Sequence, residues 1–154
     1  MEKKKKYMAL AASFGIAAAA GGLSYLLTGK TAMEGYQKLH QPPLAPPGWI
    51  FPVVWSILYA LMAISSWRVW LTGKREALRL YFTQLALNVV WTPVFFRLKL
   101  FWGAFAILLV LEAAILAMIA GFRKVDRPAA LLQVPYAIWV AFAGYLNAAI
   151  AWLN

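Results

Sequence analysis

Five long stretches of the chain carry almost no charged side chain, and short clusters of Lys and Arg separate them. A helix needs roughly 20 apolar residues to cross a hydrocarbon core of about 30 Å. The five stretches reach this length or come close to it, so we expect each to cross a membrane as a helix. They cover residues 8–27, 49–71, 80–96, 100–122 and 129–152.

The composition agrees with burial in lipid. Of the 154 residues, 64% are apolar and 13% are charged, whereas a soluble domain carries about 25% charged residues. Connections of a few residues join the last four stretches, so neighbouring spans are expected to be antiparallel and residues 1–154 to form a single membrane domain. The predicted fold class is all-α, an integral membrane bundle of five transmembrane helices.

The formal charge of +10 would suggest a nucleic-acid partner in a soluble protein. Here the cations stand at the ends of the spans, so they are interpreted as anchors in the lipid headgroup region and no nucleic-acid partner is expected. With five spans, most Lys and Arg residues fall on the side of the N-terminus, which the positive-inside tendency places in the cytoplasm. Those residues are Lys3 to Lys6, Arg68, Lys74, Arg75, Arg79, Arg123, Lys124 and Arg127.

The first stretch could also be read as a signal peptide, because a basic start precedes an apolar run. Its apolar run is longer than the seven to fifteen residues, roughly, of a signal-peptide core, so we interpret it as the first span. Small residues recur along it at four-residue spacing, which favours close helix packing in lipid. They are Gly15, Ala18, Ala19 and Gly22.

The long first loop, residues 28–48, combines a helix signal with a stiff segment. Thr31 and Glu34 form a capping-box pattern that predicts a short helix ending near Leu39. Four prolines follow between residues 42 and 47, and each fixes its own φ and restricts the residue before it. A rigid flap at the membrane surface is therefore expected, with a plain linker as the alternative.

Three spans place aromatic side chains and amides on one helical stripe. An amide in hydrocarbon is costly unless it faces inward and finds a partner. Each amide alone favours a contact between helices, and each tryptophan alone favours core packing. Together, beneath a stiff loop, they predict a pocket for a flat apolar ligand with a few polar groups. The stripes are Pro52, Trp55, Tyr59, Met62 and Ser66; then Gln84, Asn88, Trp91 or Thr92, and Phe95; and then Trp139, Ala143, Leu146 or Asn147, and Ile150.

Other candidate chemistry is sparse. Glu112 is the one acid within a span, so it must be protonated, hydrogen-bonded or turned toward a polar cavity. His40 is the one histidine, and a metal or haem ligand would need partners that the loop lacks. The chain has no cysteine, no pairing of a nucleophile with a base and no phosphate loop. No metal site and no cofactor are expected.

Three motifs resemble the translocator protein family, also called tryptophan-rich sensory proteins or peripheral-type benzodiazepine receptors. Their order and spacing match the family over nearly the whole chain. The motifs are Pro46, Pro47, Trp49, Phe51, Val54, Trp55, Leu58 and Tyr59; Gln84 to Asn88, Trp91, Pro93, Phe95 and Phe96; and Pro135, Tyr136, Trp139, Phe142, Leu146 and Asn147.

The resemblance implies a five-helix bundle, often a homodimer in the lipid bilayer, here of a bacterial cell membrane. It implies binding of porphyrins such as protoporphyrin IX, of sterols and of benzodiazepine-type ligands beneath the first loop. Two family features are missing: Gly35 and Leu44 stand where tryptophans are common, and no basic residue follows Asn147 to complete a sterol motif. The implied ligand-binding residues are Tyr36, Pro46, Trp55, Tyr59, Asn88, Trp91, Trp139 and Ala143.

Three functions remain open at this point. The first is a porphyrin-binding receptor, sensor or carrier. The second is an enzyme, because some bacterial members of the family are associated with light- and oxygen-dependent porphyrin breakdown that involves tryptophans matching Trp55 and Trp139. The third is a transporter of tetrapyrroles or sterols, although the chain lacks the broken helices and paired charges of transporters.

Overall fold

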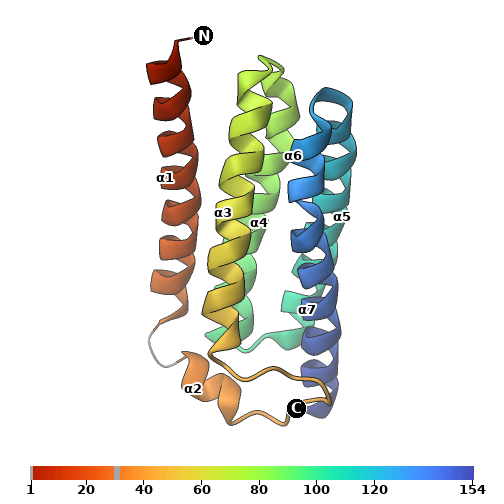
Figure 1. Ribbon diagram of the computed structural model, residues 1–154. Helices are drawn as coiled ribbons and strands as arrows, with labels where there is room; N and C mark the ends of the chain where they lie inside the picture. Colours follow the sequence, from red (N-terminus) through yellow and green to blue (C-terminus); the bar gives the residue numbers. More distant parts are fainter. Residues whose placement is uncertain (1, 30–31) are drawn as a thin grey trace.

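The computed structural model describes residues 2–29 and 32–154, and within these ranges all regular structure is helical. Figure 1 shows the long helices standing side by side, with the N-terminus at one end of the bundle and the C-terminus at the other. The helices are α1 (Lys3–Thr28), α2 (Ala32–Gln37), α3 (Ile50–Leu71), the 3₁₀ turn η1 (Arg75–Ala77), α4 (Leu78–Phe96), α5 (Phe101–Val125), α6 (Arg127–Leu132) and α7 (Val134–Leu153).

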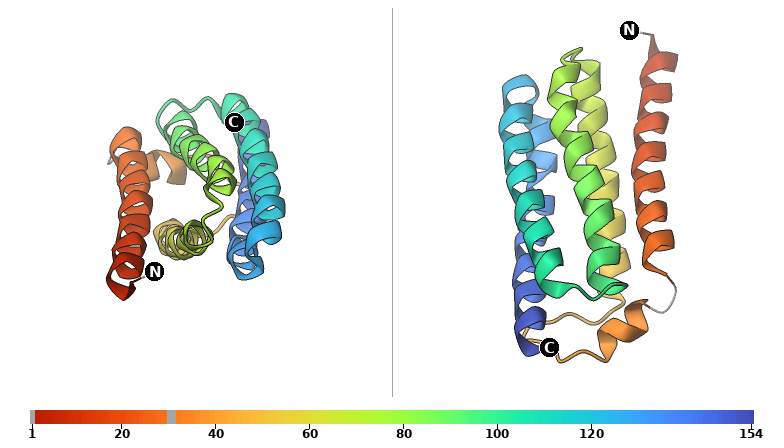
Figure 2. Two further views of the ribbon diagram at one scale, coloured as in Figure 1. Left: turned by 90° about the horizontal axis from the view of Figure 1, so that it is seen from above. Right: turned by 180° about the vertical axis from the view of Figure 1, so that it is seen from behind.

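The long helices form a ring that does not follow chain order. Helix α1 packs against both α3 and α4, and α3 also packs against α6. Helix α5 packs against α4 on one side and against α6 and α7 on the other, which closes the ring. The view along the bundle in Figure 2 shows α1 to one side, next to both α3 and α4. The first helix therefore forms one side of the bundle and bridges α3 and α4, the long helices that follow one another in sequence.

An all-α membrane fold is confirmed. Within residues 2–29 and 32–154, the helical stretches long and apolar enough to cross a membrane are Lys3–Thr28, Ile50–Leu71, Phe101–Val125 and Arg127–Leu153. Helix α4 is not among them, because Arg79, Gln84 and Asn88 lower its mean hydropathy. The fifth span therefore stays a prediction, even though α4 occupies a full place in the ring.

The last predicted span, residues 129–152, is broken into α6 and α7 at Gln133. Pro135 lies in the first turn of α7, where its missing N–H costs no helical hydrogen bond and its ring disfavours continuous helix before it. Asp126 begins α6 by accepting a hydrogen bond from the Ala129 N–H at 3.1 Å, and it pairs with Arg68 of α3 at 2.7 Å.

The small residues that the spacing singled out on α1 do not pack against other helices of this chain. Gly15 and Gly22 have no neighbouring atom within 4 Å of where a Cβ would be, and Ala18 and Ala19 are exposed. The inward face instead carries Ala17, Ala20, Gly21 and Ser24, and a Cβ on Gly21 would stand 3.4 Å from the Tyr59 ring. Both faces hold small residues, so spacing alone could not distinguish them.

The first loop crosses the end of the bundle and is fastened to α7 (Figure 1). The Tyr145 hydroxyl donates to the Pro43 carbonyl at 2.6 Å. The backbone N–H of His40 donates to Asn154 Oδ1 at 3.1 Å, and Asn154 Nδ2 donates to the His40 carbonyl at 2.9 Å. Helix α2 is shorter than expected, and its predicted cap Thr31 lies outside the described residues. The proline segment is thus held across the bundle rather than left as a free linker.

Candidate functional site

A cavity of about 510 Å³ lies at the loop end of the bundle, among α1, α3, α4 and α7. This volume is within the range of about 300–1,000 Å³ that small-molecule sites occupy. Among the residues that the structure describes, none that lines the cavity carries a charge. They are Gly21, Ser24, Tyr25, Thr28, Gly29, Ala32, Gln37, Gly48, Trp49, Phe51, Pro52, Trp55, Tyr59, Asn88, Trp91, Thr92, Phe96, Trp139 and Ala143.

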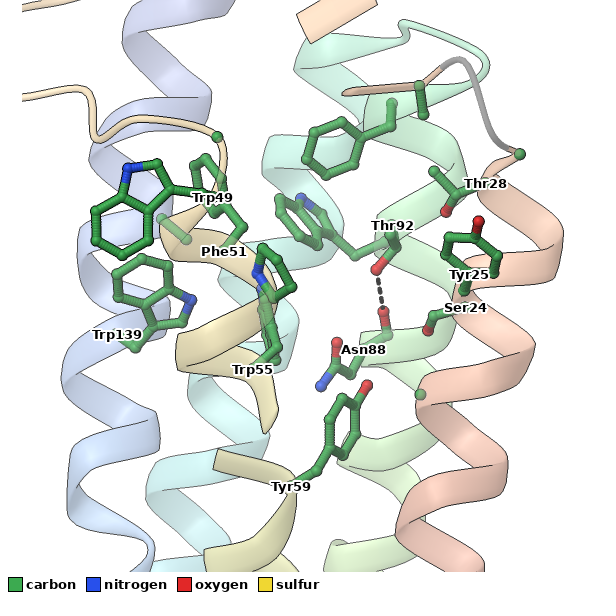
Figure 3. Close-up of a pocket in the computed structure, with 18 of the residues that line it drawn as sticks. Ser24, Tyr25, Thr28, Trp49, Phe51, Trp55, Tyr59, Asn88, Thr92 and Trp139 are labelled. Carbon is green, nitrogen blue, oxygen red and sulfur yellow. Dashed lines mark hydrogen bonds between the residues drawn. The ribbon is translucent and has the colours of Figure 1, made fainter. Parts of the chain in front are cut away.

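Aromatic rings from three helices form most of the wall. Trp55 and Tyr59 are one turn apart on α3, with ring centroids 5.8 Å apart. Phe51 meets Trp139 of α7 edge to face at 6.0 Å. Figure 3 shows these side chains on the α3 and α7 side of the cavity. Such rings offer broad apolar faces to a flat ligand, and their edges hold one another in place.

Asn88 is the polar residue at the centre of the site, and a buried chain of hydrogen bonds orients it. Its Nδ2 donates to the Tyr136 hydroxyl at 3.0 Å, and that hydroxyl donates to Gln84 Oε1 at 2.6 Å. All three side chains are buried. Oδ1 is the acceptor of the Asn88 amide, and it can accept a hydrogen bond from a ligand while Nδ2 donates to Tyr136.

Asn147 has a different role from Asn88. Its Oδ1 accepts from Trp91 Nε1 at 3.0 Å, and its Nδ2 donates to the Phe101 carbonyl at 2.8 Å. The amide thereby ties α7 to α4 and to the start of α5, with both of its polar atoms used. Asn147 is a contact between helices, and through Trp91 it fixes the orientation of an indole that lines the cavity.

Helix α1 supplies polar groups that sequence reasoning missed. Ser24 Oγ and Thr28 Oγ1 are buried and form no hydrogen bond with residues that the structure describes. Both residues line the cavity, and Figure 3 shows them on α1, beside Asn88 and Thr92 of the neighbouring α4. A signal was present, because Ser24 and Thr28 are two hydroxyl residues one turn apart near the end of α1.

Six of the eight predicted ligand-binding residues line this cavity: Trp55, Tyr59, Asn88, Trp91, Trp139 and Ala143. Trp139 also brings a buried Nε1–H that finds no acceptor in the described part of the chain. A buried donor without a partner is costly in a membrane bundle. The indole is therefore ready to donate to a ligand in the cavity.

The other two predicted residues lie outside the lining. Tyr36 of α2 is only 4% exposed and packs against Phe51 at 5.3 Å and Phe96 at 5.7 Å, so it supports the wall from behind. Burial raises the pKa of its hydroxyl, which stays protonated. Pro46 is half-buried in the loop, two residues before Gly48, which does line the cavity.

The remaining candidates do not join the site. Glu112 is half-buried on α5 and is absent from the cavity wall, and its Oε2 has no partner among the described residues. His40 is engaged through its backbone with Asn154. Residues 2–29 and 32–154 contain no cluster of three or more His, Asp or Glu side chains that could hold a metal ion.

The fold and the cavity define a helical membrane protein with a ligand-sized, aromatic site among its helices, and the described residues of that site carry no charge. The model of the TspO/MBR family matches residues 12–153. The chain belongs to that family, and it is an integral membrane protein.

Individual relatives agree. The chain is 42% identical to the tryptophan-rich sensory protein of Cereibacter sphaeroides, over 74% of this chain and 73% of that protein. It is 35% identical to the tryptophan-rich protein TspO of Chlorobaculum tepidum, over 97% of this chain and 98% of that protein. The translocator protein of Ovis aries is 42% identical, over 73% of this chain and 70% of that protein.

Proposed function

We propose that this protein is a membrane receptor, sensor or carrier that binds protoporphyrin IX or a related flat hydrophobic ligand in the cavity beneath the first loop. One observation carries the proposal: the cavity of about 510 Å³ is walled by rings of Trp49, Phe51, Trp55, Tyr59, Trp91, Phe96 and Trp139, and no described residue of its lining is charged. The name of the Cereibacter sphaeroides relative, a tryptophan-rich sensory protein, supports a sensing role.

The polar atoms of the site suit a macrocycle that is apolar on its faces and polar at a few points. Trp139 Nε1 and the Ser24 and Thr28 hydroxyls are buried without partners in the described residues, and a ligand acceptor would satisfy them. These groups stand on opposite walls of the cavity (Figure 3), so they would hold a flat ligand at more than one edge.

The carboxylates of a porphyrin require cations outside the cavity, at its loop end. The Lys99 ammonium lies beside Gly35 of α2, and Arg97 donates to the Leu27 carbonyl at 3.2 Å at the same end. Lys38 is exposed on the loop, whereas Lys30 lies outside the described residues. We assign the propionate groups to this end of the bundle, where the charges remain hydrated.

Fluorescence titration with protoporphyrin IX tests the proposal. Asn88→Ala removes the polar centre and Trp139→Ala removes a ring face together with a donor, so each is expected to weaken binding by tenfold or so. Trp102→Ala is the matched control, because Trp102 is 55% exposed on α5 and lies away from the cavity wall. Equal affinity of the parent and of folded cavity variants would refute the site, and no saturable binding by the parent would refute the function.

A second candidate is light- and oxygen-dependent degradation of the bound porphyrin. The observation in its favour is that Trp55 and Trp139 line the same cavity, so two oxidisable indoles would face one ligand. Absorption spectra of the bound porphyrin are expected to change under light and dioxygen and to stay constant under light without dioxygen. Product that forms equally fast in the Trp55→Phe, Trp139→Phe double variant would exclude this reaction.

We also propose that α4 completes five spans, with the N-terminus in the cytoplasm of a bacterial cell and two copies paired in the bilayer. The cations of the N-terminal side outnumber those of the loop side, which supports the orientation. Because the chain has no cysteine, single variants Lys4→Cys and Lys38→Cys can be labelled from one side of intact cells. Only Lys38→Cys is expected to react with an impermeant maleimide added outside, and crosslinking in membranes reports the dimer.

A further inference from the structure

A second hollow lies at the end of the bundle opposite the loop. It has a volume of about 670 Å³ and opens between α1, the end of α3 and the start of α4. Residues of the first cavity and of this groove do not overlap. Its apolar lining comprises Met8, Ala12 and Ile16 of α1 together with Leu78 and Phe82 of α4.

Three cations line the mouth of this groove. Lys5 comes from α1, and Arg75 and Arg79 come from η1 and α4. All three are exposed, and none pairs with an acid within 4.0 Å in the described ranges, where the one ion pair joins Arg68 and Asp126. Glu76 is beside Arg75 in sequence but is not part of the groove wall. The mouth therefore carries a surplus of positive charge.

The groove has the dimensions of one membrane leaflet. From Lys5 to Ile16, helix α1 rises about 16 Å at about 1.5 Å per residue, which is close to half of a hydrocarbon core of about 30 Å. The cations stand at the end near the N-terminus, where headgroups lie, and the apolar residues extend toward the bilayer centre. The cations and the apolar surface thus follow each other along the groove as the phosphate and the acyl chain do in a phospholipid.

Two features of this groove distinguish it from a simple gap between helices. The Arg75 guanidinium is 5.1 Å from the centre of the Trp70 ring, so a cation–π contact positions it at the mouth. Tyr81 also lines the groove; it is 1% exposed, and its hydroxyl has no hydrogen-bond partner among the described residues. The groove thus contains a fixed cation and a buried hydroxyl without a partner.

We propose that this groove binds one anionic phospholipid, with an acyl chain between α1 and α4 and the phosphate held by Lys5, Arg75 and Arg79. Basic pockets between membrane helices recognise lipid headgroups by this chemistry. A free phosphate ion would meet the same cations but would leave the apolar part of the groove unused. A neutral lipid would fill the apolar part and leave three cations without a counter-charge.

Native mass spectrometry of the detergent-solubilised full chain, titrated with phosphatidylglycerol or phosphatidylcholine of equal chain length, tests the proposal. The parent is expected to retain one phosphatidylglycerol in preference to phosphatidylcholine. The Arg75→Gln, Arg79→Gln double variant is expected to lose on the order of tenfold in affinity for phosphatidylglycerol. Arg123→Gln, Lys124→Gln is the control, because it removes the same charge from the same end of the bundle outside the groove.

A third variant tests the apolar part and keeps the cations. Ala12→Phe places a ring in the groove from the exposed side of α1, so it is expected to reduce lipid retention without reducing the helical circular dichroism signal. The proposal is overturned if the parent retains both lipids equally, if the charge variant binds like the control, or if inorganic phosphate displaces the lipid at equal concentration. Loss of binding in the charge variant and in Ala12→Phe, with the control unchanged, supports it.

Discussion

Removal of the Tyr136 hydroxyl is expected to weaken the fold and the ligand site together. In Tyr136→Phe, Gln84 Oε1 loses the donor at 2.6 Å and Asn88 Nδ2 loses the acceptor at 3.0 Å. Both amides are buried, and Gln84 Nε2 already lacks a partner among the described residues.

The magnitude follows from the two lost hydrogen bonds. In membrane bundles a hydrogen bond between side chains contributes about 0.6 kcal/mol on average and up to about 1.7 kcal/mol. Two such bonds correspond to about 1–3 kcal/mol in the free energy of unfolding. Once Asn88 can rotate, its Oδ1 is no longer presented to the cavity, so ligand affinity is expected to fall several-fold as well.

The assay is reversible unfolding in mixed detergent and denaturing surfactant, followed by circular dichroism, with porphyrin titration on the same samples. Tyr81→Phe is a matched control, because Tyr81 and Tyr136 are each 1% exposed but the Tyr81 hydroxyl has no partner in the described chain. The control is expected to be neutral or slightly stabilising. If both variants lower the unfolding free energy equally, the hydrogen-bond chain does not hold Asn88 in place.

Three further outcomes are expected. Gly21→Leu puts a side chain into the first cavity and should weaken porphyrin binding at least severalfold in a fluorescence titration, whereas Gly22→Leu, at a site with nothing within 4 Å, should bind like the parent. Tyr145→Phe frees the Pro43 carbonyl from its 2.6 Å hydrogen bond, so stopped-flow measurements should show faster ligand release while equilibrium helicity stays unchanged. Met62→Ala empties a site that is 0% exposed and should lower the unfolding free energy by about 2–5 kcal/mol; a loss below about 1 kcal/mol would mean that the neighbouring helices collapse into the gap.

The inward amides show where sequence reasoning succeeds. Gln84, Asn88 and Asn147 were predicted to face the bundle interior, and all three are buried and hydrogen-bonded. The physical constraint is strong, because an amide has no partner in lipid. The sequence did not separate their roles, since the partners of Asn88 and Asn147 come from helices about 50 residues away along the chain.

The first helix shows where the same reasoning fails. Small residues cover both faces of α1, and the four-residue spacing pointed to Gly15 and Gly22, whereas Gly21 and Ser24 line the cavity. Helical spacing gives relative positions around one axis and leaves the rotation of the helix about that axis undetermined. That rotation depends on contacts with α3 and α4.

By itself the sequence determined that the chain is helical and lies in a membrane, because its long stretches without charge can be buried in lipid. It also determined which helical stripes turn inward, because an amide without a hydrogen-bond partner is costly in lipid. It also predicted a stiff first loop, because four prolines restrict the backbone there. Only the tertiary structure decided the ring order, with α1 packed on both α3 and α4. It likewise decided that Ser24 and Thr28 meet Asn88 across one cavity and that Lys5 joins Arg75 and Arg79 at a second. These arrangements depend on how side chains of separate helices fit together, and no local pattern in one segment contains that information.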